Sequence, residues 1–283
     1  MSKTPAVIKT ISEMREYTSR HSGKTIGFVP TMGYLHEGHT SLVARSVAEN
    51  QITVVSIFVN PTQFGQNEDL DKYPRDLDRD LSLLSQYEVD VVFYPDHQAM
   101  YPENFKTFVE VDKLSNRYCG KSRPGHFRGV LTIVNKLVNI VTPHFMYMGE
   151  KDFQQIFILE TMLKDLNMTT KIIRCPIIRE TDGLAMSSRN TYLNKTERNN
   201  AKCLYFSLIL AKELYLDGFN NVNFIKSQMT SLIYDNGGVT DYIAFVNDKT
   251  FTEESSISDD TRILLAVKIG NTRLIDNMKI GEK

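Results

Sequence analysis

Residues 30–39 read Pro-Thr-Met-Gly-Tyr-Leu-His-Glu-Gly-His. They follow a short apolar run at 25–29, which predicts a buried strand, and they precede residues 41–50, whose apolar side chains repeat at helical spacing. A strand, a glycine-containing turn and a helix start are typical of a phosphate site, because the first N–H groups of a helix are unpaired and its dipole favours negative charge. His36 and His39 are three residues apart, so we expect them on one face of this helix start. The stretch therefore predicts phosphate binding rather than a turn with two incidental histidines.

The composition is that of an ordinary soluble globular protein. The chain has 283 residues, of which 41% are hydrophobic and 24% charged, and its formal net charge is −1. No overall positive field therefore recruits nucleic acid or an anionic membrane. Cys119, Cys175 and Cys203 are far apart and predict neither a disulfide framework nor a metal site, so the reducing cytoplasm fits best. No apolar run reaches the roughly 18 residues of a membrane span, and the N-terminal residues lack the apolar core of a signal peptide.

Strands and helices alternate from about residue 24 to residue 176, which predicts a Rossmann-like, doubly wound parallel sheet. The run 51–60 is almost continuously apolar, as in a strand buried on both faces. The expected strands are 25–29, 51–60, 90–94, 107–111, 145–148 and 170–175. The expected helices are 8–17, 41–50, 76–87, 130–141 and about 153–166.

A long, non-periodic loop at 179–190 divides the chain, so we expect one domain at 1–178 and a second at 179–283, with this loop as the hinge. After the loop, the pattern predicts two helices and three strands, which together would form a smaller α/β domain. The expected helices are 195–216 and 222–234, and the expected strands are 241–246, 262–269 and 272–276.

Four loop regions, each at a predicted strand end or at the domain junction, collect polar side chains that suit a polyphosphate beside a small polar substrate. Their possible cations or donors are His36, His39, Arg123, Arg128, Lys151 and Arg189. Their neutral hydrogen-bonding groups are Asn60, Gln63, Gln154, Gln155, Ser187 and Ser188. Phosphoryl chemistry requires positioning and charge neutralisation more than an activated side-chain nucleophile.

His36-Glu37-Gly38-His39 is similar to the HxGH signature of the HIGH-type nucleotidyltransferase superfamily, and the segment 186–189 resembles that superfamily's second phosphate-binding loop. Five further stretches closely resemble the pantothenate synthetase (pantoate–β-alanine ligase) family: FVNPTQFG at 58–65, YPRDL at 73–77, RPGHFRGV at 123–130, GEKDFQQ at 149–155 and RETDGLAMSSRNTYL at 179–193. The resemblance covers most of residues 24–193. The C-terminal lobe agrees with the family in length and placement but has no motif of its own.

The resemblance implies an ATP-dependent ligation in two steps. The carboxylate of (R)-pantoate would attack the α-phosphorus of ATP and release pyrophosphate, and the amine of β-alanine would then attack the pantoyl adenylate to give pantothenate and AMP. It also implies Mg²⁺ as a cofactor, a homodimer, and a C-terminal lobe that closes over the site and limits hydrolysis of the adenylate.

The resemblance further implies which residues form the site. ATP would contact Met32, Gly33, Tyr34, Leu35, His36, Glu37, Gly38, His39, Gly149, Glu150, Lys151, Asp152, Ile178, Met186, Ser187, Ser188 and Arg189. Among these, the residues assigned to catalysis are His36, His39, Lys151, Ser187, Ser188 and Arg189, with His39 as the proton donor. Pantoate would contact Pro30, Met32, Gln63 and Gln155, and β-alanine would contact Gln63. Mg²⁺ would be held mostly by phosphates and water with Asp80 as its carboxylate, beside Arg79 at a position that is often acidic in relatives.

Other interpretations of the same residues stay open. A nucleotidyltransferase such as a cytidylyltransferase would use the same turn, and a catalytically silent nucleotide-binding or RNA-contacting module would share the fold. The near-neutral charge and the lack of a basic, aromatic-rich face argue against RNA. Taken alone, Ser187, Ser188 and Arg189 would more often be a helix cap and a surface cation, and His126 is as compatible with a structural role as with a functional one.

Overall fold

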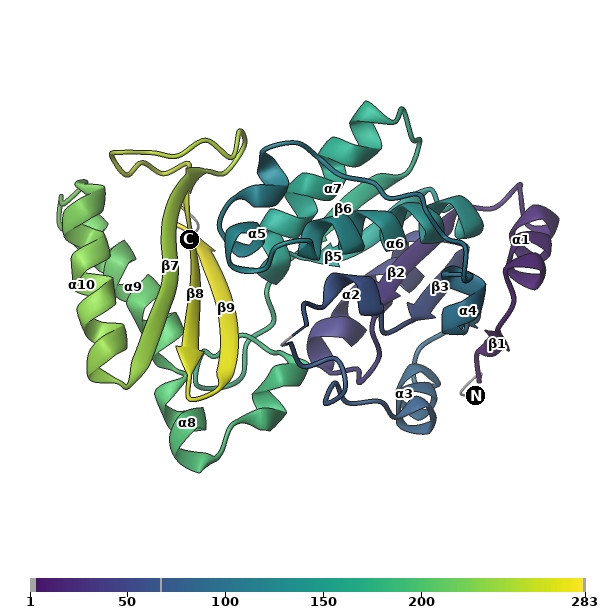
Figure 1. Ribbon diagram of the computed structural model, residues 1–283, viewed down its shortest axis with the longest axis horizontal. Coiled ribbons are helices and arrows are strands. Elements are labelled where there is room, and N and C mark those ends of the chain that lie inside the picture. The colour runs from purple at the N-terminus through teal and green to yellow at the C-terminus, as the bar shows by residue number, and fades with distance from the viewer. Residues whose placement is uncertain (1–3, 67, 282–283) are drawn as a thin grey trace. The chain divides into compact units, whose positions relative to one another are not determined.

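The computed structural model describes residues 4–66 and 68–281, and these form two compact units (Figure 1). Unit 1 comprises the described residues of 1–150 and 154–176, and unit 2 comprises those of 151–153 and 177–283. The chain therefore passes into unit 2 after Pro176, close to the expected boundary at 178, and also enters it briefly at Lys151–Phe153. Among the described helices, none is both long and apolar enough to cross a membrane.

Unit 1 is built on a six-stranded sheet in the order β1-β4-β3-β2-β5-β6, and every neighbouring pair is parallel. The strands are β1 (Ala6–Ile8), β2 (Ile26–Thr31), β3 (Ile52–Ile57), β4 (Val91–Phe93), β5 (Phe145–Gly149) and β6 (Lys171–Cys175). Every residue of β3 is buried, as its apolar run predicts for a central strand covered on both faces. The predicted doubly wound parallel sheet is confirmed.

Helices cover both faces of this sheet. They are α1 (Ile11–Arg20), α2 (Glu37–Glu49), α3 (Leu77–Leu84), α4 (His97–Met100), α5 (Cys119–Ser122), α6 (His126–Val141) and α7 (Phe153–Asp165), with 3₁₀ turns η1 (Pro61–Gln63), η2 (Leu114–Asn116) and η3 (Glu150–Asp152). Leu42 and Val43 of α2 and Leu84 of α3 pack on the same sheet face as Val29 and Val55. Because crossovers between parallel strands are right-handed, α1, α6 and α7 cover the other face.

The strand order places a switch point between β2 and β5. The chain steps from β2 outward to β3 and β4, and it then crosses back to β5 on the other side of β2. The loops that follow β2 and β5 therefore diverge from neighbouring strand ends. In open α/β sheets, ligands bind at the carboxyl ends of the strands where the order reverses in this way.

In unit 1, one expected strand is absent and one strand is present that was not expected. Residues 107–111 form no strand, because the N–H of Val109 donates to Oγ1 of Thr132 at 3.0 Å and the Arg128 guanidinium lies 3.8 Å from the centre of the Phe108 ring. This segment thus lies along α6 instead of joining the sheet. The short strand β1 at the edge of the sheet, which pairs with β4, was missed because three residues are too few to show a period.

Unit 2 contains a three-stranded antiparallel sheet made of β7 (Gly238–Asn247), β8 (Thr261–Ile269) and β9 (Thr272–Lys279), in that order. Its helices are α8 (Lys195–Asn200), α9 (Cys203–Leu216) and α10 (Val222–Asp235), and η4 (Ser188–Tyr192) is a 3₁₀ turn. The helix expected at 195–216 is interrupted at Ala201 and Lys202, so α8 and α9 are separate. The predicted smaller α/β lobe is confirmed.

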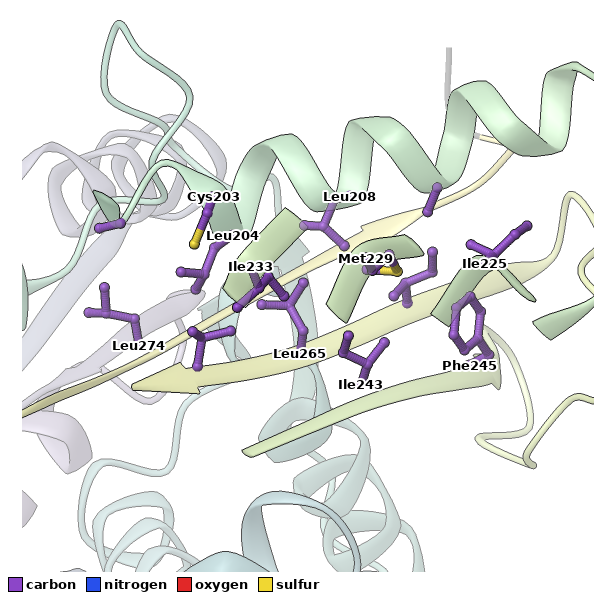
Figure 2. Packing of buried hydrophobic residues seen from close by; sticks show 14 of the residues in the cluster. Cys203, Leu204, Leu208, Ile225, Met229, Ile233, Ile243, Phe245, Leu265 and Leu274 are labelled. Atoms are coloured by element: carbon purple, nitrogen blue, oxygen red, sulfur yellow. The ribbon is translucent and has the colours of Figure 1, made fainter. Parts of the chain in front are cut away.

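One apolar core holds unit 2 together. Figure 2 shows Leu204 and Leu208 of α9 and Met229 and Ile233 of α10 meeting Leu265 of β8, and all five residues are at most 1% exposed. Helices α9 and α10 therefore cover the same face of the sheet. Two polar residues of β9, Asp276 and Asn277, are buried as well.

Candidate active site

The turn after β2 has a left-handed backbone. Gly33 has φ 82° and Tyr34 has φ 50°, a region that glycine enters without strain. A Cβ atom on Gly33 would lie 3.0 Å from Cγ2 of Ile57 and 3.1 Å from Oδ2 of Asp80. Glycine is therefore required here both for the backbone conformation and for the close packing of the turn.

Asp80 of α3 holds this turn. It is 1% exposed, and its carboxylate accepts the N–H of Tyr34 at Oδ2 and the N–H of Leu35 at Oδ1, both at 2.7 Å. Burial raises the pKa of Asp80 above its ordinary value, and these two N–H groups partly oppose that effect. The adjacent Arg79 donates to the carbonyl of Leu35 at 2.9 Å and lies 4.6 Å from the centre of the Tyr34 ring.

The surroundings of Asp80 do not fit a magnesium ligand. Mg²⁺ takes open oxygen ligands and keeps several waters, whereas this carboxylate is buried and both of its oxygens already accept backbone N–H groups. Among residues 4–66 and 68–281, no three or more His, Cys, Asp or Glu side chains are grouped to hold a metal ion. The geometry supports Asp80 as the residue that shapes the turn, and the predicted metal contact receives no support from it.

His36 and His39 cap the start of α2 together. The N–H of Gly38 donates to Nδ1 of His36 at 3.1 Å, the N–H of His36 donates to Nδ1 of His39 at 3.3 Å, and the ring centres are 4.1 Å apart. An imidazole that accepts at Nδ1 carries its proton on Nε2. The helix therefore begins at Glu37, earlier than the expected residue 41, and both histidines present Nε2–H donors at its positive end.

The loop after β3 brings two predicted contact residues together. Asn60 is 1% exposed, and its amide donates to Oε1 of Gln63 at 3.0 Å and to the carbonyl of Gly129 at 3.2 Å, while its Oδ1 accepts from the Tyr101 hydroxyl at 2.8 Å. The amide of Gln63 in turn donates to Sδ of Met32 at 3.0 Å. Gln63 and Met32, from the loops after β3 and β2, are thus direct neighbours.

The backbone of Gln63 is held from a second side. Its carbonyl accepts from Nδ1 of His126 at 2.9 Å and from Nη2 of Arg123 at 3.3 Å. Arg123 also donates to Glu68 at 2.7 Å; burial favours the protonated form of Glu68, but Arg123 outweighs it and lowers the pKa. Of the two roles left open for His126, this contact supports the structural one, and Arg123 is committed to an ion pair.

Gln155 lies in the first turn of α7 and is half-buried, as is Pro30 near the end of β2. Gln154, in contrast, is 5% exposed, and its amide accepts the N–H of Cys119 at 3.1 Å and donates to the carbonyl of Arg117 at 2.8 Å. Gln154 therefore ties α7 to the loop at 114–119. Gln154 thus has a structural role, which is consistent with the prediction of Gln155, and not Gln154, as a substrate contact.

In unit 2, Lys151 and Asp152 belong to η3, directly before α7. The carbonyl of Lys151 accepts from Nδ2 of Asn277 in β9 at 3.0 Å. The next apolar residue, Phe153, is 1% exposed, and the Arg262 guanidinium lies 4.2 Å from the centre of its ring. The root of the Lys151 side chain is therefore fixed by the sheet of unit 2.

The segment 178–190 is ordered by its own hydrogen bonds. The N–H of Met186 donates to the carbonyl of Ile178 at 3.0 Å, and Arg179 pairs with Ala185 as an antiparallel bridge. Ser187 accepts the N–H of Arg189 at 3.3 Å and caps η4. Ser187 therefore caps a helical turn, as expected of a serine at such a position. The phosphate contacts of 186–189 stay predictions.

Comparison with known proteins gives one consistent result. The family model "Pantoate-beta-alanine ligase" matches residues 6–279. The pantothenate synthetase of Caldicellulosiruptor saccharolyticus is 53% identical over 277 residues, which cover 97% of this chain and 99% of that protein. The chain belongs to the pantoate–β-alanine ligase family.

Two solved structures of this ligase family extend the likeness to three dimensions. The pantothenate synthetase of Thermus thermophilus has a TM-score of 0.90 and 39% identity, covering 97% of this chain and 99% of that one. The pantoate–β-alanine ligase of Francisella tularensis, described as complexed with beta-gamma ATP and β-alanine, has a TM-score of 0.83 and 37% identity, covering 99% of both chains. The match therefore includes the C-terminal unit, which has no sequence motif of its own.

The residues predicted for the ligase site fall into both units. Residues 32–39, Gly149, Glu150, Gln63 and Gln155 lie in unit 1, and Lys151, Asp152, Ile178 and 186–189 lie in unit 2. Sequence reasoning missed Asp276 and Asn277, which are 2% and 1% exposed. The available signal was a pair of adjacent polar residues at the end of the strand expected at 272–276. Successive side chains of a strand point to opposite faces, so one of the two would face the core and need a partner.

Proposed function

We propose that this chain condenses (R)-pantoate with β-alanine to give pantothenate, consuming ATP and releasing AMP and pyrophosphate. The observation that carries the proposal is the likeness to pantothenate synthetases, which for the C. saccharolyticus protein reaches 53% identity over 97% of this chain. The F. tularensis relative, described with beta-gamma ATP and β-alanine, supports the same nucleotide and amine as substrates here.

In the first step, a carboxylate oxygen of pantoate attacks the α-phosphorus of ATP. The bond from that phosphorus to the bridging oxygen breaks, pyrophosphate leaves with the electron pair, and pantoyl adenylate remains. A carboxylate is a weak nucleophile and approaches a highly charged triphosphate, so the step requires positioned donors and cations more than a stronger nucleophile.

The donors at the start of α2 suit this requirement. The Nε2–H groups of His36 and His39 project from the positive end of a helix, where an anionic oxygen gains from both the hydrogen bonds and the dipole. His39 is the proposed proton donor to the leaving pyrophosphate. Lys151, with Ser187 to Arg189, supplies the proposed charge and hydrogen bonds for the remaining phosphate oxygens.

In the second step, the unprotonated amine of β-alanine attacks the carbonyl carbon of the adenylate. The carbon–oxygen bond to AMP breaks, AMP leaves as an anion, and the ammonium proton passes to solvent. Because the mixed anhydride is already activated, this step mainly requires that the amine be held in line with the carbonyl.

Pantoate carries two hydroxyls, a carboxylate and a gem-dimethyl carbon, so its site needs both amides and an apolar wall. Gln63 and Gln155 are the proposed amides, because an amide both donates and accepts. Met32 and Pro30 are the proposed wall, and the 3.0 Å contact between the Gln63 amide and Sδ of Met32 already joins the two kinds of surface. Gln63 is also the proposed contact of β-alanine.

A product assay tests the proposal. The purified chain is incubated with ATP, pantoate and β-alanine, and pantothenate and AMP are quantified together by mass spectrometry. We expect both in equal amounts, and we expect His39→Ala and Lys151→Ala to lose most pantoate-dependent pyrophosphate release while their circular dichroism stays that of the wild type. Adenylation at the wild-type rate in either variant would refute the role assigned to that residue.

The same assay separates the rival functions. A nucleotidyltransferase would retain the nucleotide in its product and release no AMP, and a silent nucleotide-binding or RNA-contacting module would turn over no ATP. The full-length family likeness favours the ligase.

Three further features belong to the proposal. Mg²⁺ is expected with ATP, held by phosphate oxygens and water, because Asp80 does not fit as its ligand. The assembly is expected to be a homodimer, which light scattering at known concentration would measure. The expected compartment is the cytoplasm, in keeping with three free cysteines.

A further inference from the structure

Strand β9 carries two adjacent polar side chains that are both buried. Asp276 is 2% exposed and Asn277 is 1% exposed. In the antiparallel register Asp276 pairs with Leu265 and Asn277 with Leu264, so the two side chains point to opposite faces of the sheet. A buried carboxylate and a buried amide are stable only when they are hydrogen-bonded, so the partner of each residue shows what it holds in place.

On the face shared with Leu265 and the helices, Asp276 binds the base of the 179–189 segment. Nη1 of Arg179 donates to Oδ2 of Asp276 at 2.6 Å and Nη2 donates to Oδ1 at 3.0 Å, a bidentate pair. The same guanidinium donates to the carbonyl of Gly183 at 3.0 Å and lies 4.7 Å from the centre of the Tyr205 ring. Asp276 thereby fixes the hairpin that leads into Ser187–Arg189.

On the other face, Asn277 binds the segment 151–153. Its Nδ2 donates to the carbonyl of Lys151 at 3.0 Å, and its Oδ1 accepts from Nη1 of Arg262 at 2.7 Å. Arg262 is paired with Asp248 at 2.5 Å and lies over Phe153. One dipeptide of β9 therefore anchors both segments of unit 2 that carry proposed phosphate contacts.

We propose that Asp276 and Asn277 are positioning residues for ATP: they fix Lys151 and the Ser187–Arg189 segment at the separation that the triphosphate requires. The inference rests on the proposed function and deepens it. A triphosphate has a fixed reach, so cations held at the wrong separation cannot contact it together. A misplacement of about 1 Å in a positioned group lowers a rate on the order of 10²-fold.

The test uses two variants of one residue. Asn277→Asp keeps the acceptor for Arg262 but removes the donor to the Lys151 carbonyl, and Asn277→Ala removes both the donor and the acceptor without adding a charge. For both we expect ATP affinity in calorimetry, or the KM for ATP, to weaken by about 10-fold or more, with the KM for β-alanine unchanged. The matched control is Asp241→Asn, which breaks the 2.8 Å ion pair to Arg273 in the same sheet and should bind ATP as the wild type does.

A coupled variant separates positioning from a purely structural role. If Asn277 acts through Lys151, Asn277→Asp should add no further loss of ATP affinity in a Lys151→Ala background, whereas a structural role predicts the same loss in both backgrounds. Wild-type ATP affinity in both Asn277 variants, or equal losses in the two backgrounds, would overturn the inference while the wild-type chain still makes pantothenate. A wild-type chain that makes none would overturn the proposed function and this inference with it.

Discussion

The two units fix their proposed nucleotide-binding groups by different means. In unit 1, His36 and His39 cap each other across three residues at one helix start. In unit 2, Lys151 is held by a side chain 126 positions away, and the 179–189 segment by one 97 positions away. Hydrogen bonds between neighbours in sequence, as in the histidine cap, can be recognised as a sequence motif. Hydrogen bonds between distant residues, as from Asp276 and Asn277, can be recognised only once the strands are paired.

The two arrangements also differ in electrostatics. The histidine pair uses ring nitrogens and backbone N–H groups at a half-buried helix start, where water remains close. The anchor in β9 is a buried ion pair, in which the side chain of Asp276 is 1% exposed and that of Arg179 is 20% exposed. Removing one partner of a buried pair leaves an uncompensated charge, which is far more costly than losing a cap. A single substitution at Arg179 or Asp276 should therefore destabilise the protein more than a single substitution at either histidine.

The largest effect is expected for Arg179→Ala, which leaves the Asp276 carboxylate buried without its bidentate partner. We expect a loss of about 3–5 kcal/mol in the free energy of unfolding, measured by chemical denaturation. The matched control is the double variant Arg179→Met with Asp276→Leu, which removes both charges at similar volume and should lie close to the wild type. A loss below about 1 kcal/mol for Arg179→Ala, the value of a surface pair, would remove the contrast between the units.

A smaller effect is expected at the histidine cap. His36→Ala removes the acceptor for the N–H of Gly38 and should cost about 1 kcal/mol of stability, whereas His36→Asn restores a good cap and should cost less. Both variants lack the Nε2–H donor, so both should lose adenylation activity. Activity close to the wild type in the stable His36→Asn variant would show that the ring serves only to cap the helix.

The smallest effect concerns pH. Burial raises the pKa of Asp80, so the folded state binds its proton more tightly than the unfolded state, and this carboxyl lowers stability as pH rises above its ordinary value of 3.8. The cost of Asp80→Asn should therefore shrink as pH rises from about 4 towards neutral. Asp182 provides the opposite sign, because its hydrogen bonds to Arg198 lower its pKa in the folded state. The cost of Asp182→Asn should therefore grow as pH rises towards the ordinary pKa of 3.8 and stay constant from about pH 5 to neutral. Parallel pH profiles for the two variants would contradict these assignments.

Much of unit 1 could be predicted because its signals are local. The buried run of β3, the helical spacing in α6 and the turn at 30–39 each fit within a short window, and each is found where it was expected. The strand expected at 107–111 is absent because this segment contacts α6 instead of the sheet, through the N–H of Val109 and the ring of Phe108, and a short apolar run looks the same in either place. The spacing of His36 and His39 predicts that they lie together at the helix start. It does not predict that each ring accepts a backbone N–H at Nδ1.

Unit 2 could be predicted as a set of elements but not as part of the site. Its helices and strands show clear periods, yet nothing local in Asp276-Asn277 says that one side chain meets Arg179 and the other the carbonyl of Lys151. The same limit applies to Asp80, which was singled out by position as a metal ligand, whereas its oxygens accept the N–H groups of Tyr34 and Leu35. Which distant residues become hydrogen-bond partners depends on the topology of the fold, and composition and local spacing do not predict that topology.

The tripeptide Lys151–Phe153 belongs to unit 2 although the residues on both sides of it belong to unit 1. A ribosome makes this tripeptide well before β9, so the carbonyl of Lys151 can meet Asn277 only after the last strand of unit 2 has emerged. For the same reason, a recombinant C-terminal fragment that starts at 179 would lack Phe153, the aromatic neighbour of Arg262, and Lys151, whose carbonyl accepts from Asn277. The two units are thus interlaced along the chain, and dissecting the protein into separately expressed halves calls for a permuted design rather than a simple truncation.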